Sequence, residues 1–138
     1  MTEVMDDYQP VTGDILEELN SHVVYINQMF SEQCEFDFGY NLESIEALDS
    51  FINSTRELLD DDSKGDIARI VAPFLGEALI SIHGGNWAYY PEGDIGVNLC
   101  GGKIMASPHS KVEKQLFNGE EDSISFFYKV ILKKLSGE

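Results

Sequence analysis

The sequence predicts a single α+β domain: three N-terminal helices, a three-stranded antiparallel meander and two C-terminal helices, with the helices forming a single layer on a small sheet. Apolar residues first recur every three or four positions through residues 15–82, the period of an amphipathic helix. Short aromatic and β-branched segments separated by Gly and Pro follow in residues 87–106, and a helical period then returns. Helices and strands that are segregated along the chain, instead of alternating, are typical of the α+β class. With 138 residues and 43% hydrophobic content, the chain is expected to form one core and one domain spanning residues 1–138.

The N-terminal segment is expected to be a loose arm followed by an amphipathic helix. Residues 1–11 have no apolar period and contain Pro10, which favours an irregular arm. Thr12 or Asp14 is placed to cap a helix that ends near residue 31, because either side chain can accept a hydrogen bond from an unpaired backbone N–H. Its apolar stripe consists of Ile15, Leu19, Val23, Ile26 and Phe30.

The second helix is expected to begin after Asn41 and to end in the polar run 60–65. Its apolar stripe consists of Leu42, Ile45, Leu48 and Ile52. Glu43, Glu46 and Asp49 fall between these positions and are expected to point outward. Because carboxylates at a helix C-terminus oppose the helix dipole, the helix is expected to fray before that polar run.

The third helix is expected to be central, because its sequence is apolar around much of the helix circumference. Asp66 is the expected cap. Pro73 removes an internal hydrogen bond and predicts a kink or a late start. The pair Gly84-Gly85 ends the helix, since glycine readily adopts the left-handed conformation of a C-cap.

Three short segments, 87–90, 95–100 and 103–106, are expected to form the meander. The four-residue connection 91–94 and the two-residue connection Gly101-Gly102 are both typical of hairpins. The sheet is therefore expected to be antiparallel, with neighbouring strands adjacent in the chain.

Two helices are expected to close the chain. Pro108 and Ser110 begin the first, and Asn118-Gly119 ends it. Asp122 or Ser123 is placed to cap the second.

The negative charge of the chain lies almost entirely in its first half. The whole chain carries 25 acidic and 9 basic residues, a formal net charge of −16. Residues 1–62 hold 16 of the acidic residues and a single basic one, Arg56, whereas residues 63–138 are close to neutral. Such a surface either serves solubility or attracts a basic partner by electrostatic steering.

Composition also argues against several classes of function. A strongly acidic chain is a poor ligand for the phosphates of nucleic acids and for anionic membranes, so neither is expected as a partner. No apolar run is long enough to cross a bilayer, and Met1 is followed by acidic residues instead of the basic and apolar regions of a signal peptide. Two cysteines without a secretion signal are expected to be reduced thiols, which predicts a cytoplasmic protein.

No metal or other cofactor is expected. His22, His83 and His109 fall in three different predicted elements, and Cys34 lies far from Cys100 along the chain. Their spacing matches no Cys/His zinc motif.

A ligand pocket remains a hypothesis for four residues, Glu77, His83, Trp87 and Cys100. Glu77 interrupts the apolar third helix, where a buried carboxylate needs a partner or a raised pKa. Trp87 is expected either to pack in the core or to form an aromatic binding surface. Cys100 with His83 or His109 could form a nucleophilic pair, although a strand-end cysteine more simply packs as a small apolar residue.

From residue 73 to residue 128 the sequence resembles a diffuse group of small bacterial domains of unknown function. The resemblance rests on Leu75-Gly76-Glu77, Gly84-Gly85 with Trp87, Pro108 with Lys111-Val112, Asn118-Gly119, Asp122-Ser123 and Phe127-Tyr128. It implies no catalytic motif. In size and charge alone, the chain is also similar to the immunity proteins of bacterial toxin systems.

The leading hypothesis is a non-enzymatic protein-binding domain, and specifically an immunity protein that occludes a basic toxin or nuclease. The expected partner-binding residues are Glu17, Glu18, Glu43, Glu46 and Asp49. The alternatives are an enzyme or small-ligand-binding domain with its site at Glu77, His83, Trp87 and Cys100, a mimic of duplex DNA, and a housekeeping domain whose charge serves solubility.

Overall fold

The computed structural model describes residues 8–136 and confirms the α+β class. Within those residues it contains five α-helices and one three-stranded sheet. The elements are α1 (Gly13–Ser31), α2 (Leu42–Thr55), α3 (Asp61–His83), β1 (Gly85–Tyr89), β2 (Ile95–Leu99), β3 (Ile104–Ala106), α4 (Pro108–Asn118) and α5 (Ile124–Leu135). Short 3-10 turns at Arg56–Leu58, Cys100–Gly102 and Glu120–Asp122 join some of them.

The sheet is the predicted antiparallel meander, in the order β1-β2-β3. Trp87 lies opposite Val97, which in turn lies opposite Ala106. The connection before β3 is longer than the two-residue turn predicted. It spans residues 100–103, and Cys100 itself has a left-handed φ of 54°.

The outer edge of β1 is covered by part of the segment that was expected to be a loose arm. The backbone N–H of Val11 donates to the carbonyl of Trp87 at 3.0 Å, and the N–H of Tyr89 donates to the carbonyl of Gln9 at 2.8 Å. Val11 is buried. Residues 9–11 are therefore tied to the sheet, while residues 1–7 lie outside the described part of the chain.

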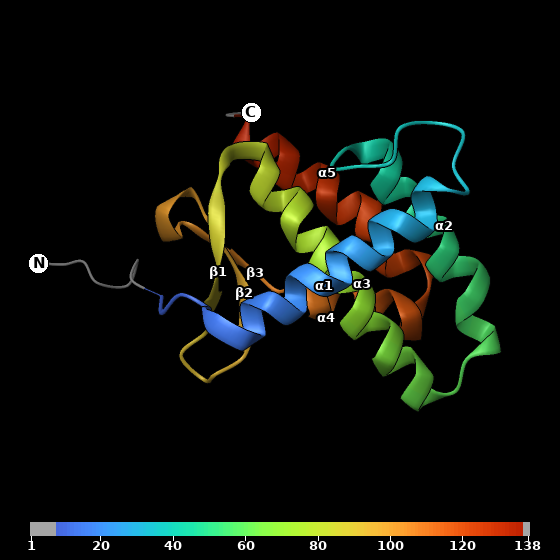
Figure 1. The fold of residues 1–138 in the computed structure, drawn as a ribbon, viewed down its shortest axis with the longest axis horizontal. Helices are drawn as coiled ribbons and strands as arrows, with labels where there is room; N and C mark the ends of the chain where they lie inside the picture. The colour runs from blue at the N-terminus through green and yellow to red at the C-terminus, as the bar shows by residue number, and fades with distance from the viewer. Residues whose placement is uncertain (1–7, 137–138) are drawn as a thin grey trace, which may run out of the picture.

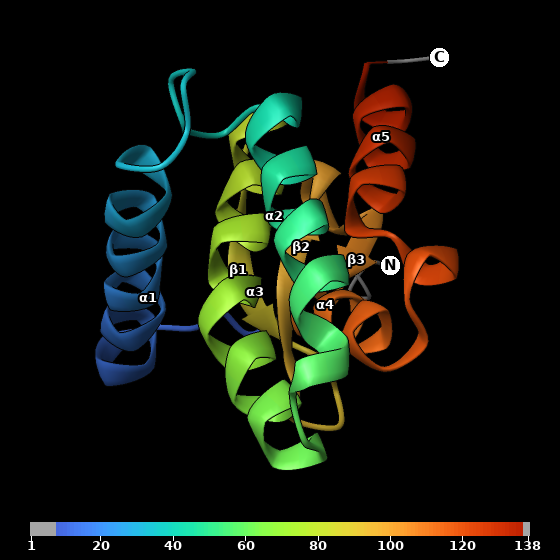
Figure 2. The ribbon, with the colours of Figure 1, turned by 90° about the vertical axis from the view of Figure 1, so that its right-hand side faces the viewer.

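The helices do not form the single layer that was expected. Figure 1 shows the sheet at one end of the molecule and α2 near the opposite end, with α3 running between them. The helix α3 contacts β1 and β2 on the sheet, and it also contacts α1, α4 and α5. Viewed from the side in Figure 2, α1 and α5 lie on opposite flanks of α2 and α3. The prediction that α3 is the central helix is confirmed by its unbroken buried stretch from Val71 to Gly76.

The packing of α3 on the sheet depends on a missing side chain. A Cβ atom on Gly76 would lie 2.2 Å from the indole carbon Cη2 of Trp87. The indole ring therefore crosses α3 at the position where the helix has no side chain. Trp87 is buried, as the core interpretation predicted.

The structure corrects the boundary between α2 and α3. The side chain of Asp60 caps α3 by accepting a hydrogen bond from the N–H of Ser63 at 2.8 Å. Asp61 and Asp62 lie in the first turn of α3, where the positive end of the helix dipole stabilises carboxylates. The polar run that was expected to end the second helix, with Asp66 as the next cap, instead begins the third.

The loop between α1 and α2 is held by aromatic stacking. The ring centroid of Phe38 lies 5.2 Å from that of Phe30 and 4.9 Å from that of Phe74. At the end of the loop, the predicted cap of α2 is confirmed, because the side chain of Asn41 accepts from the N–H of Ser44 at 2.9 Å.

In the part of the chain that the structure describes, no helix is both long and apolar enough to cross a membrane.

Candidate functional site

A cavity of about 810 Å³ lies where α1, the middle of α3, the β1–β2 turn and α4 meet. Its volume falls in the range typical of small-molecule sites. It is lined by side chains from residues 15–22, 69–73, 87–95 and 107–113, so no single segment of the sequence forms it.

One part of the cavity wall is apolar and aromatic. Ile15 and Leu19 come from α1, and Ala72 and Pro73 come from α3. Trp87 adds its indole ring, whose Nε1–H donates to Oε2 of Glu77 at 2.7 Å. This bond, together with the close fit to α3, fixes the orientation of the ring.

The charged part of the wall is mostly acidic. Glu18, Glu92, Asp94 and Glu113 line the cavity, and Arg69 is the single Lys or Arg among the lining residues. Arg69 is engaged outside the cavity lining, because its Nη1 lies 3.1 Å from Oδ1 of Asp66.

Two histidines also line this cavity. Nε2 of His22 is buried, has no hydrogen-bond partner among the described residues and lies 3.6 Å from Oε2 of Glu18. His109 is exposed near the start of α4. No group of three or more His, Cys, Asp or Glu side chains in residues 8–136 is arranged to hold a metal ion.

The acidic residues predicted to bind a partner are divided by the structure. Glu17 and Glu43 are exposed, and Glu18 lies at the cavity. Glu46 faces α5, where its Oε2 lies 3.7 Å from Nζ of Lys129. The structure therefore places these residues in different surroundings.

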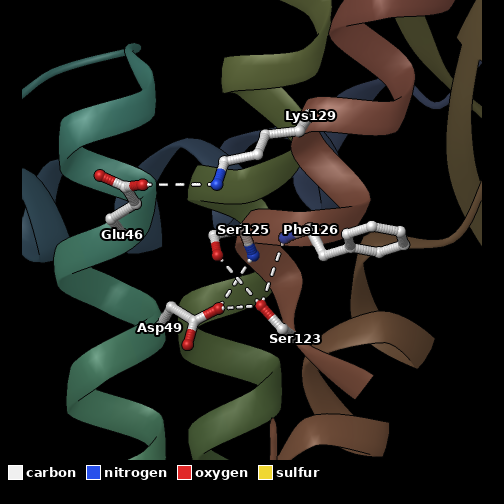
Figure 3. A network of polar contacts seen from close by, with 6 residues as sticks. All are labelled: Glu46, Asp49, Ser123, Ser125, Phe126 and Lys129. Atoms are coloured by element: carbon white, nitrogen blue, oxygen red, sulfur yellow. Dashed lines mark hydrogen bonds and ion pairs between the residues drawn. The ribbon is translucent and has the colours of Figure 1, made fainter. Parts of the chain in front are cut away.

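Asp49 was expected to point outward, and this prediction was wrong. Its side chain is only 9% exposed and accepts hydrogen bonds from the hydroxyl of Ser123, from the backbone N–H of Ser125 at 3.0 Å and from Nε2 of Gln115 at 3.0 Å. Figure 3 shows the carboxylate at the N-terminus of α5, where Ser123 also caps Phe126. Burial raises the pKa of Asp49, but these hydrogen bonds outweigh burial and hold it below its ordinary value. Asp49 thus holds α5 in place and is not available to a partner.

Gln115 completes this buried network between α2, α4 and α5. Its Oε1 accepts from the N–H of Ile124 at 2.8 Å, and its Nε2 also donates to Oδ1 of Asn53 at 3.0 Å. Gln115 is fully buried, so each of these bonds replaces one that the amide would otherwise make with water.

Arg56 has a structural role at the other end of the same corner. Its Nε donates to the carbonyl of Leu116 at 3.0 Å and its Nη2 donates to the carbonyl of Phe117 at 2.7 Å. These are C-terminal carbonyls of α4, which lack partners within the helix and carry the negative end of its dipole. The single basic residue of the acidic half is therefore largely turned toward the backbone of α4.

The four residues of the predicted ligand pocket fall in two places. Glu77 and Trp87 form the hydrogen-bonded pair described above, and only Trp87 of the two lines the large cavity. His83 and Cys100 instead line a shallower cavity of about 480 Å³, together with Lys103 and glycines of the adjoining turns. Neither cavity is lined by all four residues.

Glu77 has the partner that a half-buried carboxylate needs. The indole of Trp87 donates to it, and its charge adds to the effect of burial in raising the pKa of Tyr40. The sequence left three alternatives for Glu77, namely a raised pKa, exposure to solvent or pairing with Arg69 or a lysine, and the partner in the structure is Trp87.

Sequence reasoning missed the large cavity. Its acidic and aromatic residues are spread over four segments, and each segment has an ordinary local pattern. The PEGD turn, residues 91–94, was interpreted as a hairpin connection, although Glu92 and Asp94 also line the cavity. No protein-family model, curated protein or solved structure matches the chain. Conclusions about function therefore rest on the residues of this chain alone.

Proposed function

We propose that this chain is a non-enzymatic binding domain for a basic protein, and that its most specific form is an immunity protein occluding a basic toxin such as a nuclease. The observation that carries the proposal is the state of the charges in residues 8–62. Those residues contain 13 carboxylates, of which all but Asp49 are exposed. The single basic residue there, Arg56, is bound to the carbonyls of α4.

This arrangement favours attraction of a basic partner over internal pairing. Lys129 is the one Lys or Arg of residues 63–136 that pairs with a carboxylate of residues 8–62, and it does so at 3.7 Å between exposed side chains. Exposed pairs of this kind contribute little to stability. Exposed carboxylates of one sign therefore create a field that increases the on-rate of a basic partner and decreases with salt.

The test begins with affinity co-purification from the native host, with elution along a salt gradient and identification of the eluted protein by mass spectrometry. We expect one stoichiometric basic protein that is released by salt. The partner is then purified, and its association rate with the wild-type chain is measured across ionic strengths. Absence of a salt-labile partner at low ionic strength would contradict the proposal and would leave the acidic surface serving solubility.

Two double variants with the same change of charge locate the acidic surface. Glu17→Gln with Glu43→Gln removes two exposed carboxylates from the acidic half, and Glu120→Gln with Glu121→Gln removes two from the α4–α5 corner. The first pair should slow association several-fold at low salt and reduce its salt dependence, whereas the second should change it much less. Equal effects would show that only net charge matters.

A second candidate function is thiol chemistry at the shallower cavity. Cys100 is the one non-glycine residue of the described chain with a positive φ, 54°, and His83 and Lys103 line the same cavity. Strained backbone and nearby basic groups are features of reactive cysteines. Cys34 is an internal reference, since it is also half-buried and reduced.

Alkylation by iodoacetamide tests this second candidate. If Cys100 is an activated thiol, it should react at least ten-fold faster than Cys34 at neutral pH, and His83→Ala should remove the difference. Similar rates for the two cysteines would contradict it.

A further inference from the structure

The large cavity combines three features that together select one class of ligand. It has an aromatic and apolar wall, an excess of carboxylates and a volume of about 810 Å³. An apolar wall favours a hydrocarbon stem, and carboxylates favour a positively charged group at its end.

The charge balance of the wall is negative even after its own cation is counted. The cavity is lined by four carboxylates, those of Glu18, Glu92, Asp94 and Glu113, and by one guanidinium, that of Arg69. Arg69 already forms an ion pair with Asp66 at 3.1 Å. Of the four carboxylates, only Glu18 has a potential ion-pair partner among the described residues, which is His22 at 3.6 Å. Glu92, Asp94 and Glu113 therefore line the cavity without an ion-pair partner within 4.0 Å among residues 8–136.

Tyr90 reports this negative field from inside the cavity wall. Burial raises the pKa of its phenol, and coulombic interactions with Tyr8, Glu92 and Asp94 raise it further, of which Glu92 and Asp94 are the groups charged at neutral pH. The same field that opposes ionisation of the phenol stabilises a cation placed beside it.

Trp87 lines the site with its side chain held in a fixed position. The residue is 5% exposed, its Nε1–H donates to Glu77 and its indole ring fits against Gly76. A cation near the face of an indole ring gains electrostatic energy from the ring quadrupole, and this gain is larger for a partly desolvated cation than for an exposed one.

We propose that this cavity binds an alkyl chain ending in a guanidinium or ammonium group, with the stem against Ile15, Leu19 and Trp87 and the cation among Glu92, Asp94 and Glu113. The inference deepens the proposed function, and it rests on that function where the cation is a side chain of the basic partner. The cation is either a lysine or arginine side chain of the basic partner or a free organic amine of the same chemistry.

The direct test uses the fluorescence of the protein itself. Trp87 is the one tryptophan of the chain, so intrinsic tryptophan emission reports from the cavity wall. Emission is measured during titration with butylguanidinium and, in parallel, with butylurea, which has nearly the same shape but no charge. We expect a saturable change with butylguanidinium and at least ten-fold weaker binding of butylurea. An equal response to the two probes, or no saturation with butylguanidinium, would overturn the proposal.

Matched variants separate the cavity from the overall charge of the protein. Asp94→Asn with Glu113→Gln removes two cavity carboxylates, and Glu120→Gln with Glu121→Gln removes two exposed carboxylates that do not line it. The cavity pair should weaken butylguanidinium binding at least five-fold, and the control pair less than two-fold. If both pairs weaken binding equally, the effect is one of net charge and the cavity assignment is wrong.

Competition distinguishes the two sources of the cation. If the basic partner displaces butylguanidinium from the cavity, the cation is a partner side chain; if both bind together, the cavity takes a free organic cation. The two proposals also fail separately. Binding of butylguanidinium without any salt-labile partner would overturn the proposed function but support the cavity as a cation site. A salt-labile partner without binding of butylguanidinium would support the proposed function but overturn the cation site.

Discussion

Two polar regions of this molecule use the same kinds of side chain in opposite ways. At the α2–α4–α5 corner, Asp49, Gln115 and Arg56 are each bonded to backbone or side-chain groups of neighbouring helices. At the large cavity, Asp94 and Glu113 line an open space without an ion-pair partner among the described residues. The first region is a closed network, and the second has the unpaired carboxylates of a candidate binding site.

The difference shows that satisfaction of a charge, and not its presence, separates a structural carboxylate from a candidate binding one. The carboxylate of Asp49 accepts hydrogen bonds from Ser123 and Ser125 at the N-terminus of α5 and from the side-chain amides of Gln115 and Asn53, so its charge is already used. Arg56 complements it at the C-terminus of α4, where the helix dipole has the opposite sign. Asp49 in α2 and Arg56 in the turn after it therefore hold α5 and α4, respectively, against this segment.

The largest expected effect comes from removing the satisfied charge. Asp49→Ala removes the carboxylate that accepts from the hydroxyl of Ser123 and from the N–H of Ser125, and it removes one of the acceptors of Nε2 of Gln115. We expect a loss of about 3 kcal/mol in the free energy of unfolding, and a fall of about 10 °C in Tm. Urea unfolding followed by circular dichroism measures the change.

The control for this variant is Glu43→Ala, which lies in the same helix but is exposed and is expected to change stability by less than about 0.5 kcal/mol. If Asp49→Ala were no more destabilising than this control, the corner would not be a closed network and the comparison would fail.

The next effect concerns Trp87, which belongs to the cavity wall but is held as firmly as the corner. Gly76→Ala places a Cβ 2.2 Å from the indole, so the ring must move. Overpacking of this kind costs about 1–3 kcal/mol, which exceeds the gain of about 1 kcal/mol from the better helix propensity of alanine. We expect a net loss of roughly 1 kcal/mol and a shifted tryptophan emission.

The matched control is Gly65→Ala in the same helix, where nothing lies within 4 Å of the new Cβ. It should stabilise the protein by about 0.5–1 kcal/mol, because alanine restricts the unfolded chain more than glycine does. A loss of stability in Gly76→Ala together with a gain in Gly65→Ala would confirm that the indole of Trp87 needs the space at Gly76. A stabilising Gly76→Ala would show that the cavity wall can rearrange freely.

The charge of Asp49 also predicts a pH dependence. Because the pKa of Asp49 is lower in the folded protein than its ordinary value of 3.8, its ionised form adds stability above that value, and this contribution is lost as the pH falls through the folded pKa. Asp49→Asn should therefore be about 1 kcal/mol less stable than wild type at pH 7, and the gap should narrow below pH ~4. Denaturation of both proteins from pH 7 to pH 2.5 tests this, since the other carboxylates contribute equally to both. A constant gap would mean that the charge of Asp49 is not what holds α5.

The elements of the fold were predictable where the signal is local. The apolar period located all five helices, Asn41 was placed correctly as the cap of α2, and Ser123 was one of two residues predicted to cap α5. The boundary at Asp60 was misplaced because a run of acidic residues after an apolar stripe reads equally well as an end or a beginning. The helix dipole decides between them, and it favours the beginning.

The roles of individual polar residues were less predictable. Asp49 lies four residues after Ile45 and next to Leu48, so it falls at the edge of the apolar stripe, and this position was a usable signal for an inward orientation. Gln115, three residues after Val112 and next to Leu116, also lies at the edge of an apolar stripe. What each of them contacts depends on how α2, α4 and α5 pack, and no local pattern encodes that. The cavity is formed in the same way by four distant segments, which explains why its carboxylates could not be grouped from the sequence.

The smallest expected effect comes from the cavity, where removal of acidic residues should leave the stability of the protein almost unchanged. Asp94→Asn with Glu113→Gln should change the free energy of unfolding by less than about 0.5 kcal/mol, with a slight gain at low salt from reduced repulsion. Urea unfolding at low and high salt measures this change. Asp49→Asn, which removes a hydrogen-bonded carboxylate, is measured in parallel as the reference. A loss above about 1 kcal/mol would mean that these carboxylates already have partners within the chain. The cavity would then be a second structural network, and the reason for expecting a cation there would disappear.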